Sequence, residues 1–356
     1  MKLLKLNTNR VWRTYLGGKK LEKFLSDSET TDKHFPEEWI GSVVKAINPN
    51  SNESEGLSKV NLNKGKIATL LEIIESDPNK FLGEGHVKQF GHDTGVLVKL
   101  LDAAERLSIQ VHPNKEKAKS LFNSNFGKTE AWYILGGRSI NGEEPHIYFG
   151  FKQGITQEVW EEKFSKQDID GMLNCMHKIY VKPGEVYLIE GGMPHAIGAG
   201  CFILEIQEPT DYTVRVERST PNGYNIPDEL CHQGLGFKKM FDCFEYSGYS
   251  KEEVLNNWRL KAEWSTTCNE QHLIRYKDTP CFSMDKIVVD KSVELRYTKS
   301  FSILIVMKGK GRIIYEFGEI EIQKGDKVFI PAFVKKITCK NNNEDIEIIR
   351  CFPPKL

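Results

Sequence analysis

Polar and apolar residues alternate in two short stretches near the middle of the chain. Every second residue of positions 107–112 is polar, and these residues are Ser108, Gln110 and His112. Positions 128–133 alternate in the same way and place Lys128, Glu130 and Trp132 on one face. Because side chains along a β-strand point alternately to two faces, each stretch predicts a strand with a polar face. Two such strands would direct several chemically active groups into the interior of a β-barrel, where they could hold a polar ligand.

The rest of the pattern predicts a mainly β protein. Further strands are expected at residues 10–16, 38–44, 96–101, 147–150, 180–189, 201–207 and 212–217, and again at residues 282–289, 301–306, 311–317 and 324–331. Residues 96–101 are typical of a continuous apolar strand that is buried on both faces. Apolar residues at helical spacing predict one helix at residues 67–76 and two short helices between residues 156 and 178. Residues 221–260 mix helical and irregular patterns.

A weak internal repeat indicates a second barrel. The order of turn, strand and proline at residues 182–194 returns at residues 324–331. We therefore expect tandem barrels, with a catalytic metal-binding barrel at residues 1–150 and 179–240, a helical insertion at residues 151–178, and a second barrel at residues 241–356. No histidine follows His272, so we expect the second barrel to lack a histidine metal site and to act as structural support or as an interface.

Composition limits the classes of partner. The 356 residues contain 49 Lys and Arg and 49 Asp and Glu, so the formal net charge is zero. This balance argues against binding nucleic acid or a membrane through bulk electrostatics, and no apolar run approaches the roughly 20 residues of a membrane helix. The eight cysteines show no CxxC pair, which indicates reduced thiols in a cytoplasmic protein. We expect a small-molecule partner and a monomer or homodimer.

Four residues form the metal hypothesis, namely Gln110, His112, Glu130 and His195. Two imidazoles and a carboxylate are the usual ligands of an open catalytic zinc site. His195 would come from a turn after Pro194. A lone strand histidine is more often structural, so the hypothesis depends on the coincidence of the four residues. Two histidines and a carboxylate also describe the iron site of Fe(II) oxygenases, which stays an alternative.

Basic residues near these ligands indicate an anionic substrate. Lys128 shares a strand face with Glu130, and Arg215 lies on a further strand. A metal ion with one carboxylate ligand, together with Lys and Arg, favours a phosphate group. For Arg215, an ion pair with Glu217 or Asp211 is the alternative. The sequence contains no phosphate loop of the type GxxxxGK[ST], no GxGxxG and no GxSxG.

Several motifs resemble those of type I mannose-6-phosphate isomerases, also called phosphomannose isomerases, which are zinc enzymes of the cupin superfamily. The matching segments are PEEWIGS (36–42), LSIQVHPNKEKA (107–118), GKTEAWYIL (127–135), GGMPHAIGAG (191–200) and LEIQEPTDYTVRV (204–216). They follow the family's order over residues 10–216, whereas the last hundred residues match only as a generic metal-free cupin barrel. Many long members have a Gly-Leu-Thr-Pro-Lys run after the arginine. Residues 216–222 differ from that run and contain no lysine, so the resemblance does not extend to that residue.

The resemblance implies a mainly β fold of tandem cupin (jelly-roll) barrels and one zinc ion per chain on Gln110, His112, Glu130 and His195. It implies substrate-binding roles for Ser108, Lys128, Glu205, Asp211 and Arg215, with Lys128 and Arg215 also catalytic. The implied reaction interconverts mannose 6-phosphate and fructose 6-phosphate through a cis-enediol. A zinc-bound water, Glu205 and Asp211 all remain candidates for the base. A phosphosugar-binding cupin without catalytic activity is a further alternative.

Overall fold

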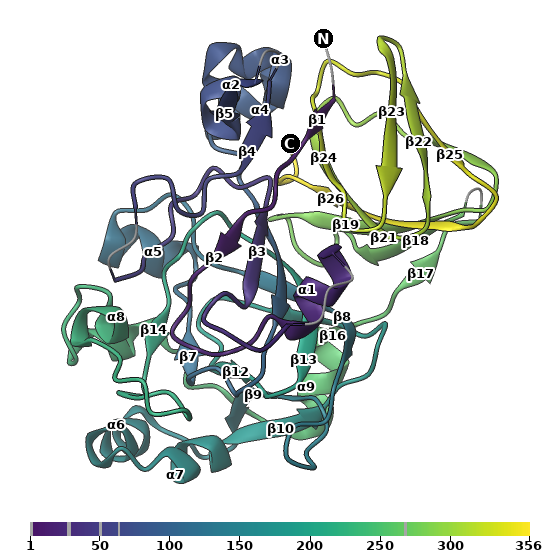
Figure 1. The fold of residues 1–356 in the computed structure, drawn as a ribbon. Helices are drawn as coiled ribbons and strands as arrows, with labels where there is room; N and C mark the ends of the chain where they lie inside the picture. The colour runs from purple at the N-terminus through teal and green to yellow at the C-terminus, as the bar shows by residue number, and fades with distance from the viewer. Residues whose placement is uncertain (1–2, 27–29, 50–51, 63–64, 267–268) are drawn as a thin grey trace.

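The alternating patterns of the sequence fold into four main β-sheets, two in each half of the molecule (Figure 1). The computed structural model describes residues 3–26, 30–49, 52–62, 65–266 and 269–356. In both halves, the inner faces of two sheets enclose buried side chains, as expected for a jelly-roll barrel. The prediction of a mainly β fold with cupin-like barrels is confirmed.

Two antiparallel sheets face each other in the first half. The larger sheet has the order β16 (Arg259–Leu260), β11 (Val186–Ile189), β8 (Glu130–Gly137), β13 (Cys201–Gln207), β6 (Leu97–Asp102), β3 (Glu37–Ile40) and β2 (Arg10–Val11). The smaller sheet has the order β10 (Met176–Tyr180), β9 (His146–Lys152), β12 (His195–Ile197), β7 (Gln110–Val111) and β14 (Val214–Arg215), with β15 (Gly248–Tyr249) alongside β9. All ladders in these two sheets are antiparallel except the β15–β9 pair, which is parallel.

The second half repeats this arrangement near the C-terminus. One sheet has the order β1 (Leu4–Lys5), β24 (Lys327–Ile330), β21 (Ser302–Lys308), β26 (Ile346–Phe352), β19 (Ser283–Val289), β18 (Glu270–Ile274) and β17 (Glu263–Trp264). The other has the order β20 (Ser292–Leu295), β25 (Ile337–Asn341), β22 (Lys310–Tyr315) and β23 (Gly318–Gln323). Between them lies a separate apolar core that includes Ile287, Leu304 and Ile348.

Short helices cover the ends and outer faces of the sheets. They are α1 (Lys19–Ser26), α2 (Leu70–Ser76), α3 (Pro78–Leu82), α4 (Glu84–Phe90), α5 (Lys115–Phe122), α6 (Gln157–Lys166), α7 (Ile169–Asn174), α8 (Asp228–His232), the 3-10 helix η2 (Lys239–Cys243) and α9 (Lys251–Trp258). The two helices expected between residues 156 and 178 are confirmed as α6 and α7. Thr156 caps α6 by accepting a hydrogen bond from the Val159 amide, as an N-cap threonine does.

Several expected elements begin or end at the wrong residue. The helix expected at residues 67–76 begins at Leu70, because residues 67–69 form β5 (Ile67–Thr69), which pairs with β4 (Lys59–Asn61). The strand expected at residues 38–44 ends at Ile40, because Gly41 has a φ of 62°, outside the β region. The strand expected at residues 10–16 ends at Val11.

The strand expected at residues 107–112 is also shorter than predicted, since only Gln110–Val111 pair as β7. The carboxylate of Glu217 explains part of this difference. It accepts a hydrogen bond from the Ile109 amide at 2.6 Å, so a side chain takes the place of a strand partner there. Ser108 and His112 therefore lie just outside the ladder, although they still flank Gln110.

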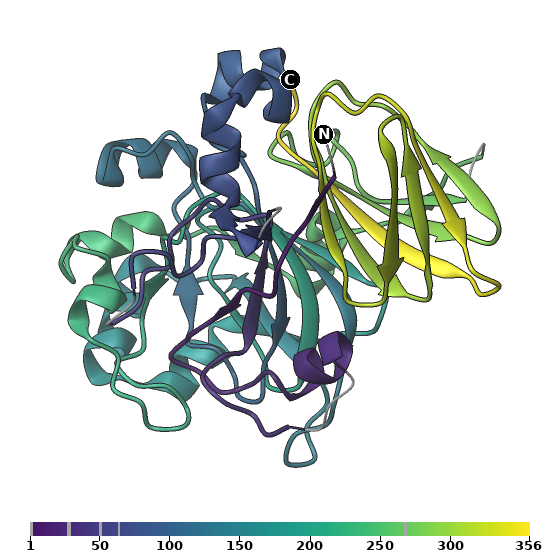
Figure 2. The ribbon, with the colours of Figure 1, turned by 45° about the horizontal axis from the view of Figure 1, so that its top comes forward.

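The N-terminal strand β1 links the two halves. It lies at the edge of the C-terminal sheet, where it pairs with β24, and the chain continues from it into the first half (Figures 1 and 2). Next to it, the Lys327 ammonium lies 2.6 Å from the Glu38 carboxylate, and both side chains are almost fully buried. Lys327 belongs to the second half and Glu38 to β3 of the first, so a buried ion pair joins the two barrels.

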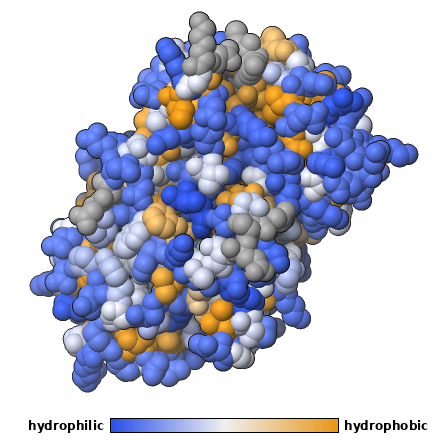
Figure 3. Space-filling view, in the orientation of Figure 1, coloured by the Kyte–Doolittle hydropathy of each residue, from blue (hydrophilic) through white to orange (hydrophobic). Residues whose placement is uncertain are grey.

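Hydrophilic residues dominate the face shown in Figure 3, where hydrophobic residues form only scattered patches. Large exposed hydrophobic side chains include Phe35, Trp264 and Phe317. Within the described parts of the chain, no helix combines the length and the apolar character that a bilayer-spanning helix needs.

Candidate active site

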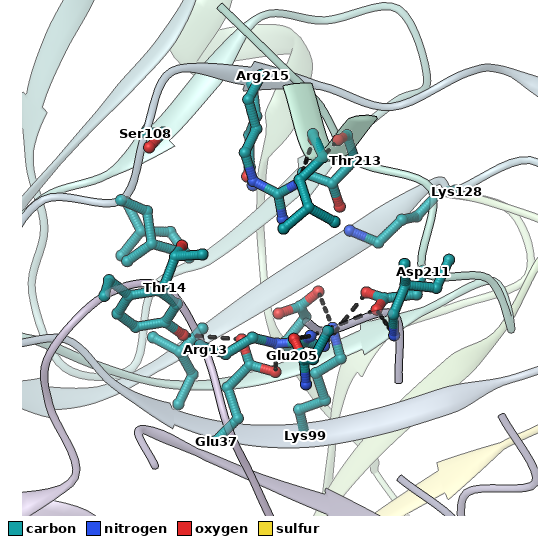
Figure 4. Close-up of a pocket in the computed structure, with 18 of the residues that line it drawn as sticks. Arg13, Thr14, Glu37, Lys99, Ser108, Lys128, Glu205, Asp211, Thr213 and Arg215 are labelled. Atoms are coloured by element: carbon teal, nitrogen blue, oxygen red, sulfur yellow. Dashed lines mark hydrogen bonds and ion pairs between the residues drawn. The ribbon is translucent and has the colours of Figure 1, made fainter. Parts of the chain in front are cut away.

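A polar cavity lies between the two sheets of the first barrel. Charged residues that line it are Arg13, Glu37, Lys99, Lys128, Glu130, Glu205, Asp211 and Arg215, and polar ones include Ser108 and Gln110. Figure 4 shows Ser108 and Arg215 on one side of this space and Arg13, Glu37, Lys99 and Glu205 on the other. The site thus collects side chains from strands that are far apart in the sequence.

Strand register places three of the predicted site residues in one row. His195 on β12 and Arg215 on β14 are both register partners of Gln110 on β7, one on each side. His112 follows β7 directly and is 1% exposed. The smaller sheet therefore supplies an amide and a guanidinium to the cavity, and it brings two imidazoles next to Glu130 at the cavity wall.

The larger sheet supplies the acidic and ammonium groups from the opposite side. Glu130 begins β8, and Lys128 lies two residues before it. The Glu208 carboxylate fixes the segment that leads into β8, because it accepts hydrogen bonds from the amides of Gly127 (3.2 Å) and Thr129 (2.9 Å). Lys128 is thereby held at the start of β8, and its side chain is only 3% exposed.

The ligand atoms of His112, Glu130 and His195 lie within 4.8 Å of one another. His112 Nε2 is 3.2 Å and His195 Nε2 is 3.5 Å from the Glu130 carboxylate. The Lys128 ammonium lies 2.7 Å from His112 Nε2 and 3.2 Å from Glu130 Oε2. Two imidazole nitrogens and a carboxylate this close together are a donor set that fits a divalent metal ion.

Both imidazoles are prepared to act as neutral ligands. Nδ1 of His112 lies 2.9 Å from the Tyr212 carbonyl, and Nδ1 of His195 lies 2.9 Å from the Met193 carbonyl. A carbonyl accepts a hydrogen bond, so each Nδ1 carries the proton and each unprotonated Nε2 lies on the side of the Glu130 carboxylate. Burial and the Lys128 ammonium lower the pKa of His112 to about 3, and burial also lowers the pKa of His195.

The other two ligand candidates fit as well. Burial opposes ionisation of Glu130, yet Lys128 and His112 hold its pKa well below the usual value. Its buried Oε2 atom lies 3.2 Å from both the Lys128 ammonium and His112 Nε2. The Gln110 side-chain amide lies 3.2 Å from His195 Nε2, close enough to join a shared ion. The structure thus brings together all four residues predicted from the sequence, and their assignment as ligands stays a prediction.

Trp132, on the same face as these groups, orients one of them. Its indole Nε1 donates a hydrogen bond of 3.1 Å to Glu130 Oε1, and its ring packs edge-on against His195. The side chain is fully buried. Trp132 fixes a carboxylate that the metal would use, as surrounding hydrogen bonds commonly do in metal sites.

Ser108 and Arg215 form one end of the cavity. The Ser108 hydroxyl is buried and has no hydrogen-bond partner among the described residues. The Arg215 guanidinium donates from NH1 to the carbonyls of Thr213 and Leu230. The alternative of an ion pair with Glu217 or Asp211 is wrong, because Glu217 pairs with Arg106 and Asp211 with Arg13. This end therefore offers a hydroxyl and a guanidinium to an anion.

Glu205 and Lys99 are neighbours on β13 and β6, opposite that end. They are register partners, and the Lys99 ammonium lies 3.6 Å from the Glu205 carboxylate. Lys99 also donates a hydrogen bond of 2.5 Å to the Gln207 amide oxygen. Burial raises the pKa of Glu205 to about 8, even though Lys99 opposes the shift. A carboxyl group with such a pKa can gain or lose a proton near neutral pH.

Several charged and polar residues that line the cavity were not predicted from the sequence. They are Arg13, Tyr15, Glu37 and Lys99. For Lys99 the signal was present, because a lysine in an otherwise apolar buried strand requires a partner. Glu37 also lies in a strand whose residues are all buried. Arg13 and Tyr15 follow the short strand β2, where no periodic pattern indicates which way a side chain points.

A second group of potential metal ligands lies in the C-terminal barrel. Glu270, His272 and Asp285 have ligand atoms within 4.8 Å of one another. His272 itself belongs to β18 of that barrel, so the barrel carries a histidine in a possible ligand group, contrary to the prediction. However, the Arg296 guanidinium lies 2.6 Å from Asp285 and 3.9 Å from Glu270. This cluster offers one imidazole where the first offers two, and an arginine contacts both of its carboxylates, so it matches the usual zinc ligand set less well than the first.

Comparisons with known families match both halves. Residues 3–130 match the profile described as phosphomannose isomerase type I, catalytic domain, and residues 269–353 match the profile described as mannose-6-phosphate isomerase, cupin domain. The mannose-6-phosphate isomerase ManA of Bacillus subtilis is 30% identical over 255 residues, which cover 70% of this chain and 74% of that protein. The mannose-6-phosphate isomerase of Streptococcus mutans is 27% identical, and the alignment covers 70% of this chain and 73% of that protein.

Solved structures share the fold over the whole chain. The mannose 6-phosphate isomerase from Bacillus subtilis superposes with a TM-score of 0.74 at 24% identity and covers 99% of both chains. A mutant of phosphomannose isomerase from Salmonella typhimurium has a TM-score of 0.76 at 16% identity and covers 100% of both chains. At these identities the similarity supports the fold.

The metal hypothesis predicts the result of removing either imidazole. We expect wild-type protein to bind about one metal ion per chain, and we expect His112→Ala and His195→Ala to lose it while they keep the wild-type circular dichroism spectrum. Elemental analysis of purified protein measures the metal content. His272→Ala in the second cluster is the matched control and should keep the ion. A wild-type metal content in either first-site variant would show that the ligand assignment is wrong.

Proposed function

The chain belongs to the type I phosphomannose isomerase family, and on that premise we propose that it interconverts mannose 6-phosphate and fructose 6-phosphate with a bound zinc ion. The observation that carries the proposal is the cavity itself. Gln110 and Glu130 of the metal-ligand group line this space together with Ser108, Glu205 and Arg215. Among the described residues the Ser108 hydroxyl has no hydrogen-bond partner and the Arg215 guanidinium has no carboxylate partner, and the pKa of Glu205 is raised. Each of these groups has a use in an aldose–ketose isomerisation.

Gln110, His112, Glu130 and His195 are the residues that would hold zinc. Zinc binds neutral imidazoles and ionised carboxylates. Here the two unprotonated Nε2 atoms lie 3.2 and 3.5 Å from the Glu130 carboxylate. When bound, zinc would supply positive charge that stabilises the negative charge developing on the sugar oxygens. The amide of Gln110 beside His195 favours zinc over the Fe(II) alternative, whose usual ligand set is two histidines and one carboxylate.

Charge balance supports a phosphorylated substrate. The charged groups that line the cavity are four cations (Arg13, Lys99, Lys128 and Arg215) and four carboxylic acids (Glu37, Glu130, Glu205 and Asp211). A divalent metal ion would leave this buried space with excess positive charge, which a phosphate carrying about −1.5 to −2 charges would offset. We place the phosphate at Ser108 and Arg215, which have free hydrogen-bonding capacity, with Lys128 nearby.

The reaction moves a proton between C2 and C1 of the open-chain sugar through a cis-enediol. We assign this transfer to the carboxyl group of Glu205. Its raised pKa allows it to accept the proton and return it. Asp211 is less suited, because both of its oxygens accept hydrogen bonds, from the Arg13 guanidinium and from the Ile47 amide. Binding of the remote phosphate would orient the sugar so that C1 and C2 face Glu205.

A coupled assay tests the activity. We expect the protein to convert mannose 6-phosphate to fructose 6-phosphate, to lose activity after treatment with a chelator, and to regain it with added zinc. Stoichiometric iron together with oxygen uptake would support the oxygenase alternative instead. Binding of mannose 6-phosphate to zinc-loaded protein without turnover would support a non-catalytic cupin.

Truncation of Arg215 tests the phosphate site. We expect Arg215→Ala to raise KM for mannose 6-phosphate about 10- to 100-fold, because a hydrogen bond to a charged group contributes about 1.5–3 kcal/mol. Steady-state kinetics measures the effect. The matched control is Arg218→Ala, an exposed arginine three residues along that does not line the cavity. A KM equal to that of the wild type in Arg215→Ala would place the phosphate elsewhere.

Substitution of Glu205 tests the proton transfer. Glu205→Gln keeps the shape of the side chain and removes its ability to ionise, so we expect kcat to fall by about 100- to 10,000-fold while the metal content is unchanged. Glu185→Gln provides a control beside the same sheet, since Glu185 directly precedes β11 and does not line the cavity. If Glu205→Gln retains the kcat of the wild type, another group transfers the proton.

A further inference from the structure

The guanidinium of Arg13 connects segments that meet at the cavity. Its Nε donates a hydrogen bond of 3.0 Å to Glu37 on β3, and NH1 donates one of 3.0 Å to Asn48. NH1 and NH2 donate to the two oxygens of Asp211 at 3.4 and 3.2 Å. The guanidinium also lies over the Trp39 ring, 4.9 Å from its centroid. Arg13 is 6% exposed, so a buried cation bridges two buried carboxylates.

These bonds leave Arg13 little capacity to bind a substrate. All three guanidinium nitrogens already donate to protein oxygens. Burial disfavours the charged form, but Asp211 and Glu37 raise the pKa of Arg13 above its ordinary value. Its effect on the reaction would therefore pass through the groups that it holds.

Asp211 connects Arg13 to the segment that contacts His112 and Arg215. Its next neighbour, Tyr212, offers the carbonyl that accepts the hydrogen bond from His112 Nδ1. Thr213 offers the carbonyl that accepts from Arg215 NH1 at 3.1 Å. A single short segment thus orients a proposed metal ligand and the proposed phosphate arginine. The Arg13–Asp211 contact fixes that segment against β3 and against the Ile47 amide.

We propose that Arg13 is a positioning residue of this isomerase, which sets the affinity for the phosphosugar by holding Asp211 and the segment 211–215 at the cavity. The inference rests on the proposed function of the site. Proton transfer depends on Glu205, which lies within the β13 ladder and keeps its own partners without Arg13. Loss of Arg13 should therefore raise KM more than it lowers kcat.

A double-mutant cycle with Asp211 tests this route. We expect Arg13→Gln to raise KM for mannose 6-phosphate about tenfold and to change kcat only a few-fold, since coupled neighbours typically share about 0.5–3 kcal/mol. We expect the Arg13→Gln/Asp211→Asn variant to raise KM no further than the larger of the two single changes. Multiplicative KM effects of the two changes would overturn the inference, because they would mean that Arg13 does not act through Asp211.

Arg138→Gln is the matched control for a purely structural role. Arg138 also connects two carboxylates, Asp102 at 3.0 Å and Asp32 at 2.6 Å, but it does not line the cavity. We expect this control to lower the melting temperature without raising KM. A KM increase in the control as large as that in Arg13→Gln would overturn the inference, because general destabilisation would then explain both.

Arg13→Lys covers the case in which Arg13→Gln does not fold. It keeps the charge, but an ammonium cannot hold both carboxylates with the planar fork of a guanidinium, so we expect an intermediate rise in KM. If Arg13→Lys has the same KM as an active wild-type enzyme, the positioning role is overturned and the proposed function is not. Absence of turnover by the wild type itself would overturn the proposed function and this inference together.

Discussion

Compensation of buried charge is the constraint on which the first barrel depends. Four carboxylic acids and four basic side chains line one cavity between two sheets, and an isolated charge in such a place would cost several kcal/mol. Ion pairs between these acids and basic side chains reduce the free-energy cost of burying their charges. Arg13 lies between Glu37 and Asp211, Lys99 lies beside Glu205, and Lys128 lies beside Glu130. The groups left outside such pairs, above all Arg215 and the Ser108 hydroxyl, are then the ones available to a ligand.

Antiparallel register converts this charge pattern into a site. Gln110, His195 and Arg215 form one row across the smaller sheet, while Glu205 and Lys99 form a row across the larger one. Each strand fixes its residue by backbone hydrogen bonds that do not involve the cavity. A preorganised arrangement of this kind lets binding energy serve orientation instead of rearrangement of the protein.

The C-terminal barrel contributes to the same arrangement from outside. Strand β3 carries Glu37 toward the cavity and Glu38 toward Lys327 of the second barrel. Removing one partner of such a buried pair typically costs about 3–5 kcal/mol. The N-terminal strand β1 also pairs with β24 of that barrel. The second barrel therefore supports β3, the strand that carries Glu37, the ion-pair partner of Arg13. Its own polar cluster is separate, and there Arg296 pairs with Asp285.

The sequence by itself determined the mainly β fold, the helices α6 and α7, and the candidate ligands, because alternation, capping and motif spacing are local properties of the chain. Gln110, His112, Glu130 and His195 could be selected in advance, and the structure brings them together. Only the tertiary structure decided the rest. It ended β2 and β3 early and brought Arg13 to Asp211 across 198 positions of the chain. It also left Arg215 without a carboxylate partner among the residues that the structure describes. Which charges meet depends on how distant strands pack, and no local pattern encodes that.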